Sequence, residues 1–268
     1  MNEEVVRPSI GDRWPLRSIL SALADTGEVF LLMGQVVREL PFGLRKIGLV
    51  VNQMAAIGIG SIPLTLIVAL FTGAVAAVQA AYQMRDYVPM VYLGTVIGKS
   101  VVIELGPVLT AIVVGGRVGA SVAAELGTMR VTEQVDAMET MGISPIRYLV
   151  VPRFVAATIM LPVLPIFADI IAIFGGYLVS VGTLDITSHT FTSGLKMYFQ
   201  MHDVFSGLIK AFFFGMIIAT MGCFYGLKSE GGAEGVGVAT TKAVVASCVL
   251  ILVVDFLLAS FLFRVLFA

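Results

Sequence analysis

The chain has 268 residues, of which 58% are hydrophobic and 13% are charged, and its mean hydropathy is +0.97. Soluble domains carry roughly 25% charged residues, so this charge is too small to cover a globule of this length in water. Seventeen basic and eighteen acidic residues give a net charge of −1, which offers no cationic field to a phosphate backbone. The composition excludes an ordinary soluble enzyme, a disordered protein and a nucleic-acid binder, and it indicates a polytopic helical membrane protein.

The segment 15–45 has the pattern of an amphipathic helix. Its apolar residues recur at helical spacings, at Leu16, Ile19, Leu20, Leu23, Phe30 and Val37. Polar and charged residues occupy the other faces, so we expect a helix that lies in the membrane interface. A helix that packs on a soluble partner is the alternative.

Five apolar runs follow, and they predict membrane spans at about 54–82, 96–123, 154–184, 204–227 and 243–263. Gly58, Gly60 and Pro63 predict a break or kink at the start of the first span. With the N-terminus inside, the cytoplasmic segments hold eleven basic residues and the outer segments hold four, at Arg85, Lys196, Lys210 and Arg264. The bias favours a cytoplasmic N-terminus and a periplasmic C-terminus. The predicted fold is an all-α integral membrane protein, a single domain with one interfacial helix and five transmembrane helices.

Ionisable residues fall at membrane depth, among them Glu104, Arg117, Asp169 and Asp255. An isolated ion at mid-bilayer costs roughly 2.5 kcal/mol or more, so each should face a partner or a wet cavity. Glu104 and Arg117 are thirteen residues apart, about 20 Å along a helix, so we do not expect them to pair. Asp169 and Asp255 serve either as a proton or cation relay or as interhelical hydrogen-bonding groups, and we favour the second.

A short acidic helix is predicted at 129–142, on the cytoplasmic side. Its apolar positions are Val131, Val135, Met138 and Met141. Its polar positions include Glu133, Gln134, Asp136 and Glu139, and Gly142 fits its C-terminus. So small a polar helix needs a surface to dock against, which is either a partner or its own bundle.

Small residues recur every four positions in several spans. The rows are Gly73, Ala77 and Ala81, then Gly94 and Gly98, Gly115 and Gly119, and Gly222 and Gly226. Such rows let helix backbones approach closely, either within one bundle or in a homodimer contact.

The two cysteines and two histidines form no metal-binding pattern, and we expect no metal site.

The run ELGPVLTAIVVGGRVGASVAAELGTMRVTEQVDAM, residues 104–138, closely resembles the signature of the MlaE (YrbE-type) permease family. The resemblance continues at 145–154 and 239–245 and at Asp255, so it extends over nearly the whole chain. It implies the membrane subunit of an ABC transporter that moves phospholipid between the bacterial inner membrane and the outer envelope. The implied partners are a second permease copy, two cytoplasmic ATPase subunits that bind ATP and Mg²⁺, and a periplasmic ring of MCE-domain protein. The permease itself is expected to have no cofactor and no ATPase site.

The resemblance also assigns residues. It implies a lipid cavity near Glu104, where we place Lys99, Gly73, Ala77 and Pro107 as well. Some relatives carry Arg directly before that glutamate, where this chain has Ile103, so Lys99 is our candidate for the cation. The coupling helix that meets the ATPase is implied at Arg130, Thr132, Glu133, Gln134, Asp136, Met138 and Glu139.

Two other functions stay open. One is an ion-coupled secondary transporter that uses Asp169, Asp255 and Glu104 as a proton route. The other is a passive scaffold for an envelope complex.

Overall fold

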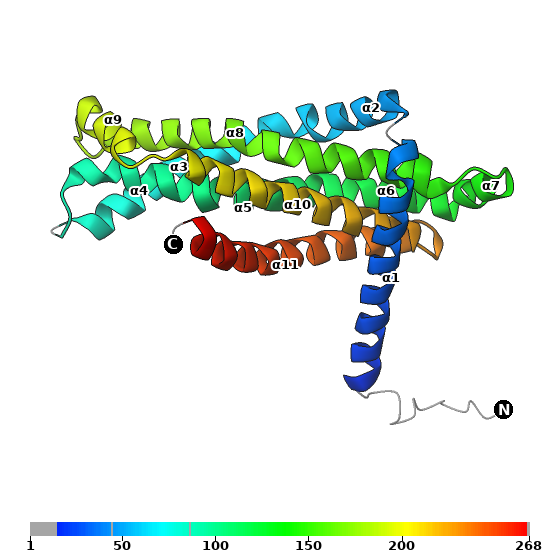
Figure 1. Cartoon of the computed structure of the whole chain (residues 1–268). Helices are drawn as coiled ribbons and strands as arrows, with labels where there is room; N and C mark the ends of the chain where they lie inside the picture. The colour runs from blue at the N-terminus through cyan, green and yellow to red at the C-terminus, as the bar shows by residue number, and fades with distance from the viewer. Residues whose placement is uncertain (1–14, 44, 86, 267–268) are drawn as a thin grey trace, which may run out of the picture.

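The computed structural model describes residues 15–43, 45–85 and 87–266 (Figure 1). Every regular element within these ranges is helical. Five helical runs are long and apolar enough to cross a membrane, at Ile47–Met84, Met90–Val131, Ile146–Gly182, Met201–Leu227 and Gly232–Leu262. The prediction of an all-α membrane protein with five spans is confirmed.

The first span is interrupted near its start. Helix α2 (Ile47–Ile57) is followed by the short 3₁₀ turn η2 (Ile59–Ser61) and then by α3 (Ile62–Met84). The Ser61 hydroxyl donates to the Ile57 carbonyl at 2.7 Å and satisfies one backbone group at the break. The interruption falls where the glycines predicted it, since Gly lowers helix stability and Pro at the first turn of a helix is tolerated.

The second span is longer than the predicted 96–123, and two π-helical stretches interrupt its α-helix. After the 3₁₀ turn η3 (Met90–Tyr92), three α-helical stretches alternate with two π-helical ones. In chain order they are α4 (Leu93–Ser100), η4 (Val101–Leu105, π), α5 (Gly106–Val114), η5 (Gly115–Gly119, π) and α6 (Ala120–Val131). A short helix, α7 (Gln134–Thr140), follows.

The other spans pack around α8 and α10. A third π-helical stretch, η6 (Ile146–Val150), leads into α8 (Val151–Gly182), and α9 (Ser188–Met197) follows at the opposite end of the bundle from α7 (Figure 1). Then come α10 (Met201–Leu227) and α11 (Gly232–Leu266). Among the spans, α10 is the most buried and α11 the least.

Helix α1 (Pro15–Gly43) lies across the end of the bundle that carries α7 (Figure 1). A helix across the spans runs parallel to the membrane plane. The side chains of residues 15–23, which include the first four predicted apolar positions, lie outside the described part. Val36 is buried against the bundle, whereas Phe30 and Val37 of the predicted apolar face are exposed.

Ion pairs hold α1 in this position. Lys228, directly after α10, reaches Asp25 and Glu28 of α1 with its Nζ at 2.6 Å from a carboxylate oxygen of each. Arg147 of η6 donates from Nε to Glu39 at 2.8 Å. The hydrogen bonds from Lys228 to Asp25 and then to Glu28 raise the pKa of the lysine above its usual value.

The rows of small residues pack within one chain. A Cβ on Gly73 would lie 1.7 Å from the carbonyl oxygen of Ala172 in α8. Gly94 lies in the same way against Phe191 of α9, and Gly222 against Gly119 of the second span. The structure therefore favours the first of the two interpretations, close packing inside a single bundle.

We predict that Gly73→Ala destabilises the protein by about 1–3 kcal/mol, because the added methyl group forces α3 away from α8. Gly34→Ala in α1 is the matched control, since nothing lies within 4 Å of its Cβ position. A mid-helix Gly→Ala change without a clash should be neutral or stabilising by up to about 1 kcal/mol. Unfolding of both variants in detergent micelles measures the difference. Equal stability of the two would contradict the close contact.

We also predict that α1 loosens from the bundle at alkaline pH. Folding raises the pKa of Lys228, so its contribution is complete below the unfolded pKa of about 10.4 and is lost as the pH rises through the folded value. Hydrogen exchange of α1 amides, corrected for the intrinsic pH dependence, should increase above this pH. In Lys228→Met the hydrogen exchange of α1 should be fast at all pH values. If exchange in this variant still increases at alkaline pH, titration of Lys228 is not the cause.

Candidate functional site

An ionic cluster lies inside the bundle, where the second, fourth and fifth spans meet. The Nζ of Lys210 in α10 is 2.6 Å from Glu104 Oε1 in η4 and 3.0 Å from Asp255 Oδ1 in α11. The lysine side chain is 1% exposed, that of Asp255 18% and that of Glu104 39%. Glu104 therefore gives the cluster its open side, whereas Lys210 is enclosed.

The π-helical stretch η4 positions Glu104. Gly106 donates its N–H to the carbonyl of Val101, five residues earlier, and Pro107 has no N–H to offer. The wider turn interrupts the regular side-chain spacing of the span, and such turns are frequent at functional sites. Gly207 of α10 packs closely on the same stretch, since its Cβ would lie 2.3 Å from the carbonyl oxygen of Val102.

Lys99 does not join this cluster, contrary to the prediction. Its Nζ is 3.4 Å from Oδ2 of Asp203, a fully buried residue in the first turn of α10. The same carboxylate accepts a hydrogen bond from the backbone N–H of Gln200 and so caps the helix. The cation beside Glu104 comes from α10 and not from the preceding turn of the second span.

The other predicted cavity residues lie in helix contacts. Gly73 and Ala77 are buried in the close contact of α3 with α8, and Pro107 is buried where η4 and α5 meet α10. In a single chain, these three residues position helices.

Arg117 and Asp169 are separate from the cluster and from each other. Arg117, in the π-helical stretch η5, donates to Ser61 Oγ at 2.8 Å and to the Ala56 carbonyl at 3.5 Å, so it fills the break in the first span. Asp169 of α8 places Oδ1 against Gly106, whose Cβ would lie 1.7 Å from it. Glu104 and Arg117 do not pair, as predicted.

The predicted cytoplasmic helix consists of two pieces. Helix α6 continues to Val131, the chain turns at Thr132 and Glu133, and α7 begins at Gln134. Glu133 has φ +60°, a left-handed conformation that prevents one continuous helix. The turn is held by hydrogen bonds from Thr132 Oγ1 to the Thr128 carbonyl at 2.8 Å and from Gln134 Nε2 to Thr132 Oγ1 at 3.1 Å.

We call residues 130–142 the foot, because this segment extends beyond the end of the bundle (Figure 1). Arg130 forms an ion pair with Asp136. Of the apolar positions, Val135 is buried, Met138 is half-buried and Met141 is 66% exposed, so the predicted apolar row is only partly covered. Glu133, Gln134, Asp136 and Glu139 are all exposed, and the foot presents a mainly acidic surface.

Gly142 ends the foot as predicted, in a left-handed conformation with φ +72°. Its N–H donates to the Glu139 carbonyl, and the next N–H, of Ile143, donates to the Met138 carbonyl. This pair of bonds is the Schellman motif of helix C-termini.

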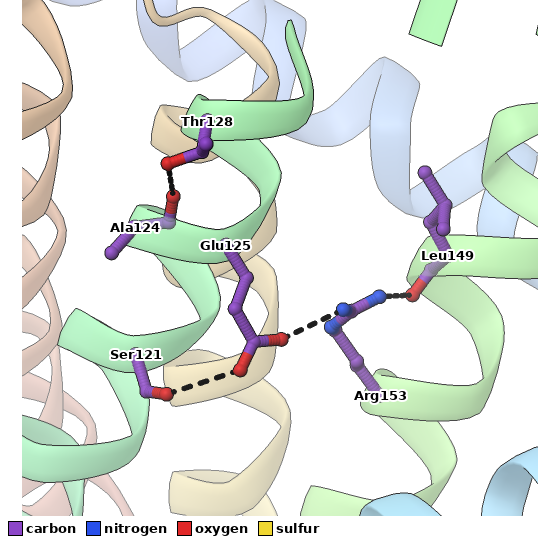
Figure 2. A network of polar contacts seen from close by, with 6 residues as sticks. All are labelled: Ser121, Ala124, Glu125, Thr128, Leu149 and Arg153. Carbon is purple, nitrogen blue, oxygen red and sulfur yellow. Dashed lines mark hydrogen bonds and ion pairs between the residues drawn. The ribbon is translucent and has the colours of Figure 1, made fainter. Parts of the chain in front are cut away.

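A polar network fixes the base of the foot (Figure 2). Glu125 of α6 accepts from Arg153 Nη2 of α8 at 2.9 Å and from Ser121 Oγ at 3.3 Å. Arg153 is 8% exposed and also donates from Nη1 to the Leu149 carbonyl at 2.9 Å. The network joins the second and third spans just inside the end from which the foot extends.

Lys210 is the site residue that sequence reasoning misplaced, since it was counted among the outer basic residues. The sequence did contain a signal for this role, because an unaccompanied lysine in an apolar run requires a carboxylate from another span, and Glu104 and Asp255 were available.

Among the described residues, no three His, Cys, Asp or Glu side chains come together in a way that could hold a metal ion.

These features define a polytopic helical membrane protein with paired charges inside its bundle and a small acidic segment beyond one end. The sequence profile of the family described as Permease MlaE matches residues 50–261, which is most of the chain and all five spans. The chain therefore belongs to the MlaE permease family.

Individual relatives agree. A probable ABC transporter permease protein of Rickettsia prowazekii is 45% identical over 219 residues, 82% of this chain and 85% of the relative. One of Synechocystis is 41% identical over 248 residues, 92% and 91% of the two chains. The intermembrane phospholipid transport system permease protein MlaE of Haemophilus influenzae is 34% identical over 235 residues, 87% and 90% of the two chains. The chain is thus an ABC-type permease.

We predict that Lys210→Met destabilises the protein by about 3–5 kcal/mol, because the substitution leaves two carboxylates in the bundle without their cation. Asp255→Asn in the same chain should restore part of this loss. A double-mutant cycle of the two changes, read from unfolding in detergent, should give a coupling of at least about 1 kcal/mol. Additivity within about 0.5 kcal/mol would mean that the two residues do not interact.

Proposed function

We propose that this chain is the membrane subunit of an ABC transporter that moves phospholipid between the inner membrane and the outer envelope of a bacterium. The family supports this proposal, as does the Haemophilus relative, whose name specifies intermembrane phospholipid transport. The chemistry is also suitable, since an ionic cluster among apolar helices offers polar contacts to a headgroup and apolar contacts to acyl chains.

The proposed orientation places α1 and the foot in the cytoplasm and the C-terminus in the periplasm. Basic residues gather in the segments at the end of the bundle that carries α1 and the foot. The side chain of Lys210 in α10 is buried in the bundle, so Lys210 is not one of the outer basic residues. Without it, the excess of basic residues on the cytoplasmic side is larger.

We place the ATPase partners at the foot. The partners bind ATP and Mg²⁺, and this chain supplies no catalytic group for hydrolysis. The exposed side chains of Glu133, Gln134, Asp136 and Glu139 offer a docking surface together with the half-buried Met138, and Arg130 and Thr132 hold its shape.

The observation that carries the proposal is the continuity of the second span. One helical run, Met90–Val131, holds Glu104 in its outer half and leads directly to the foot at its other end. A displacement of the foot is therefore transmitted to the ionic cluster through a single covalent element. The π-helical stretches η4 and η5 divide this element and give it places to bend.

The proposed transporter contains two permease copies. Glu104 opens to the outside of the single chain, and a charged group at this depth requires a second protein surface or a wet cavity. Two copies that face each other enclose such a cavity. A ring of MCE-domain protein lies on the periplasmic side of this pair.

In the proposed mechanism, ATP binding draws the two feet together and narrows the cavity, which expels the lipid. Coupling of this kind requires two arrangements of the pair, each favoured by a different ligand. The family and the relatives favour the ABC transporter over the proton route of a secondary transporter. Of the three carboxylates of that route, Glu104 and Asp255 both pair with Lys210, whereas Asp169 lies against Gly106.

The test is charge reversal on the foot. The double variant Glu133→Lys/Glu139→Lys changes exposed groups and keeps the Arg130–Asp136 pair intact. We expect ATP-driven lipid transfer by the reconstituted complex to fall at least about tenfold, since the loss of roughly 1.4 kcal/mol of binding to the ATPase suffices. Asp185→Lys is the control, because it reverses one exposed charge at the opposite end of the bundle and, like Glu133, Asp185 has a left-handed backbone conformation. Lipid transfer that continues without any nucleotide-hydrolysing partner would refute the proposal.

A further inference from the structure

A groove runs along the outside of the bundle between α1, α10 and α11, away from the ionic cluster. It consists of two adjoining hollows that share Asp25, Tyr225 and Lys242. We call them the apolar groove and the polar pocket.

The apolar groove has a volume of about 790 Å³. Its walls include Phe30 of α1, Met221 and Phe224 of α10, and Val245, Val249 and Leu250 of α11. Phe30, Val245 and Val249 are more than half exposed in the single chain. A wall of this composition suits a hydrocarbon chain.

The polar pocket has a volume of about 460 Å³ and carries charges of both signs. Lys228 is already neutralised by Asp25 and Glu28 of α1. Lys242 makes no ion pair with any residue that the structure describes, and the same is true of Glu230 and Glu234. The polar pocket is therefore lined by one cation, Lys242, and two anions, Glu230 and Glu234, that are available to a ligand.

A tight turn brings these charges together. Gly231 and Gly232 have φ +83° and +74°, a left-handed conformation that glycine adopts without strain. Gly235 then packs on the Glu230 carbonyl oxygen, which would lie 1.6 Å from a Cβ at this position. The turn places Glu230, Glu234 and Lys242 on the rim of the groove.

The depth of the groove matches one leaflet of a bilayer. From Lys242 to Leu250 there are eight residues of α11, or about 12 Å of helix at 1.5 Å per residue. Half of a hydrocarbon core of about 30 Å is about 15 Å. The groove thus begins at a charged rim and extends about as far as an acyl chain does in one leaflet.

We propose that this groove binds one zwitterionic phospholipid of the leaflet beside α1. Lys242 takes its phosphate, Glu230 and Glu234 face its ammonium group, and an acyl chain lies along α11. A lipid with an anionic headgroup alone leaves both glutamates without a counter-charge. The site requires only that the chain is embedded in a bilayer, so it goes beyond the proposed transport activity.

The test uses the full chain in vesicles that contain equal amounts of phosphatidylethanolamine and phosphatidylglycerol, with a photoreactive acyl chain on one lipid at a time. We expect photoreactive phosphatidylethanolamine to label the peptides that carry residues 221–225 and 245–250. Phosphatidylglycerol should label them at least about tenfold less. The position of the label distinguishes this site from any lipid near Glu104, and labelling that persists in a chain without transport activity separates this proposal from the proposed function.

Two variants and a control sharpen the result. Lys242→Glu and Val249→Trp should each reduce the label at least about tenfold, the first through the phosphate contact and the second by filling the groove. Val253→Trp, one turn further along α11 and outside the groove, is the matched control and should leave the label unchanged. Unchanged labelling in both groove variants, or equal labelling by the two lipids, would overturn the proposal.

A second copy of the chain in the groove would overturn it as well. Val249→Cys in a chain that also carries Cys223→Ser and Cys248→Ser gives the readout. Disulfide-linked dimers of this variant in vesicles, absent from the same chain without Val249→Cys, would show that protein covers the groove.

Discussion

The pairing of Lys210 with two carboxylates is the constraint on which the arrangement of the spans depends. A lysine enclosed in a membrane bundle is tolerated only with a counter-charge, and here Glu104 and Asp255 supply it from two other spans. The second, fourth and fifth spans are thereby fixed at one depth relative to one another. Rotation of any of the three helices, or a shift by one turn, separates charges that form no other ion pair with a described residue.

The same principle explains the other charged groups of the bundle. Lys99 pairs with Asp203, Arg117 fills the break in the first span, and Arg153 joins Glu125 to α8. Each contact links a span to an element distant in sequence, so the polar groups determine which helices meet and apolar packing fills the space between them. Glu104 and Arg117 both lie in π-helical stretches, where a widened turn changes the direction of a side chain without ending the helix.

Much of the fold could be predicted from the sequence, because long apolar runs and helix-breaking residues are local signals. The five spans, the break at Gly58 and Gly60 and the end of the foot at Gly142 are of this kind. The partners of charged residues were not predictable in the same way, because they depend on which helices become neighbours. Lys99 was assigned to Glu104 as the cation that replaces the arginine of some relatives, whereas the folded chain gives it Asp203, 104 residues later. The left-handed Glu133 also carries no local signal, since most residue types avoid this conformation.

Because the small residues pack inside one chain, they limit how two permeases can contact each other. Gly73, Gly94 and Gly222 are already occupied by contacts with other helices of the same chain. A second copy therefore cannot use these rows and must meet the chain through larger side chains. The part of α11 beyond the groove has such a surface, with Leu252, Phe256 and Leu257 all more than half exposed. Because Asp255 lies on this helix and Glu104 beside it, a contact along α11 would bring the ionic clusters of two copies toward a common space. The small residues are thus used for packing inside one chain, and the open side of the bundle, with Glu104 and Asp255, is left for contact with a second permease.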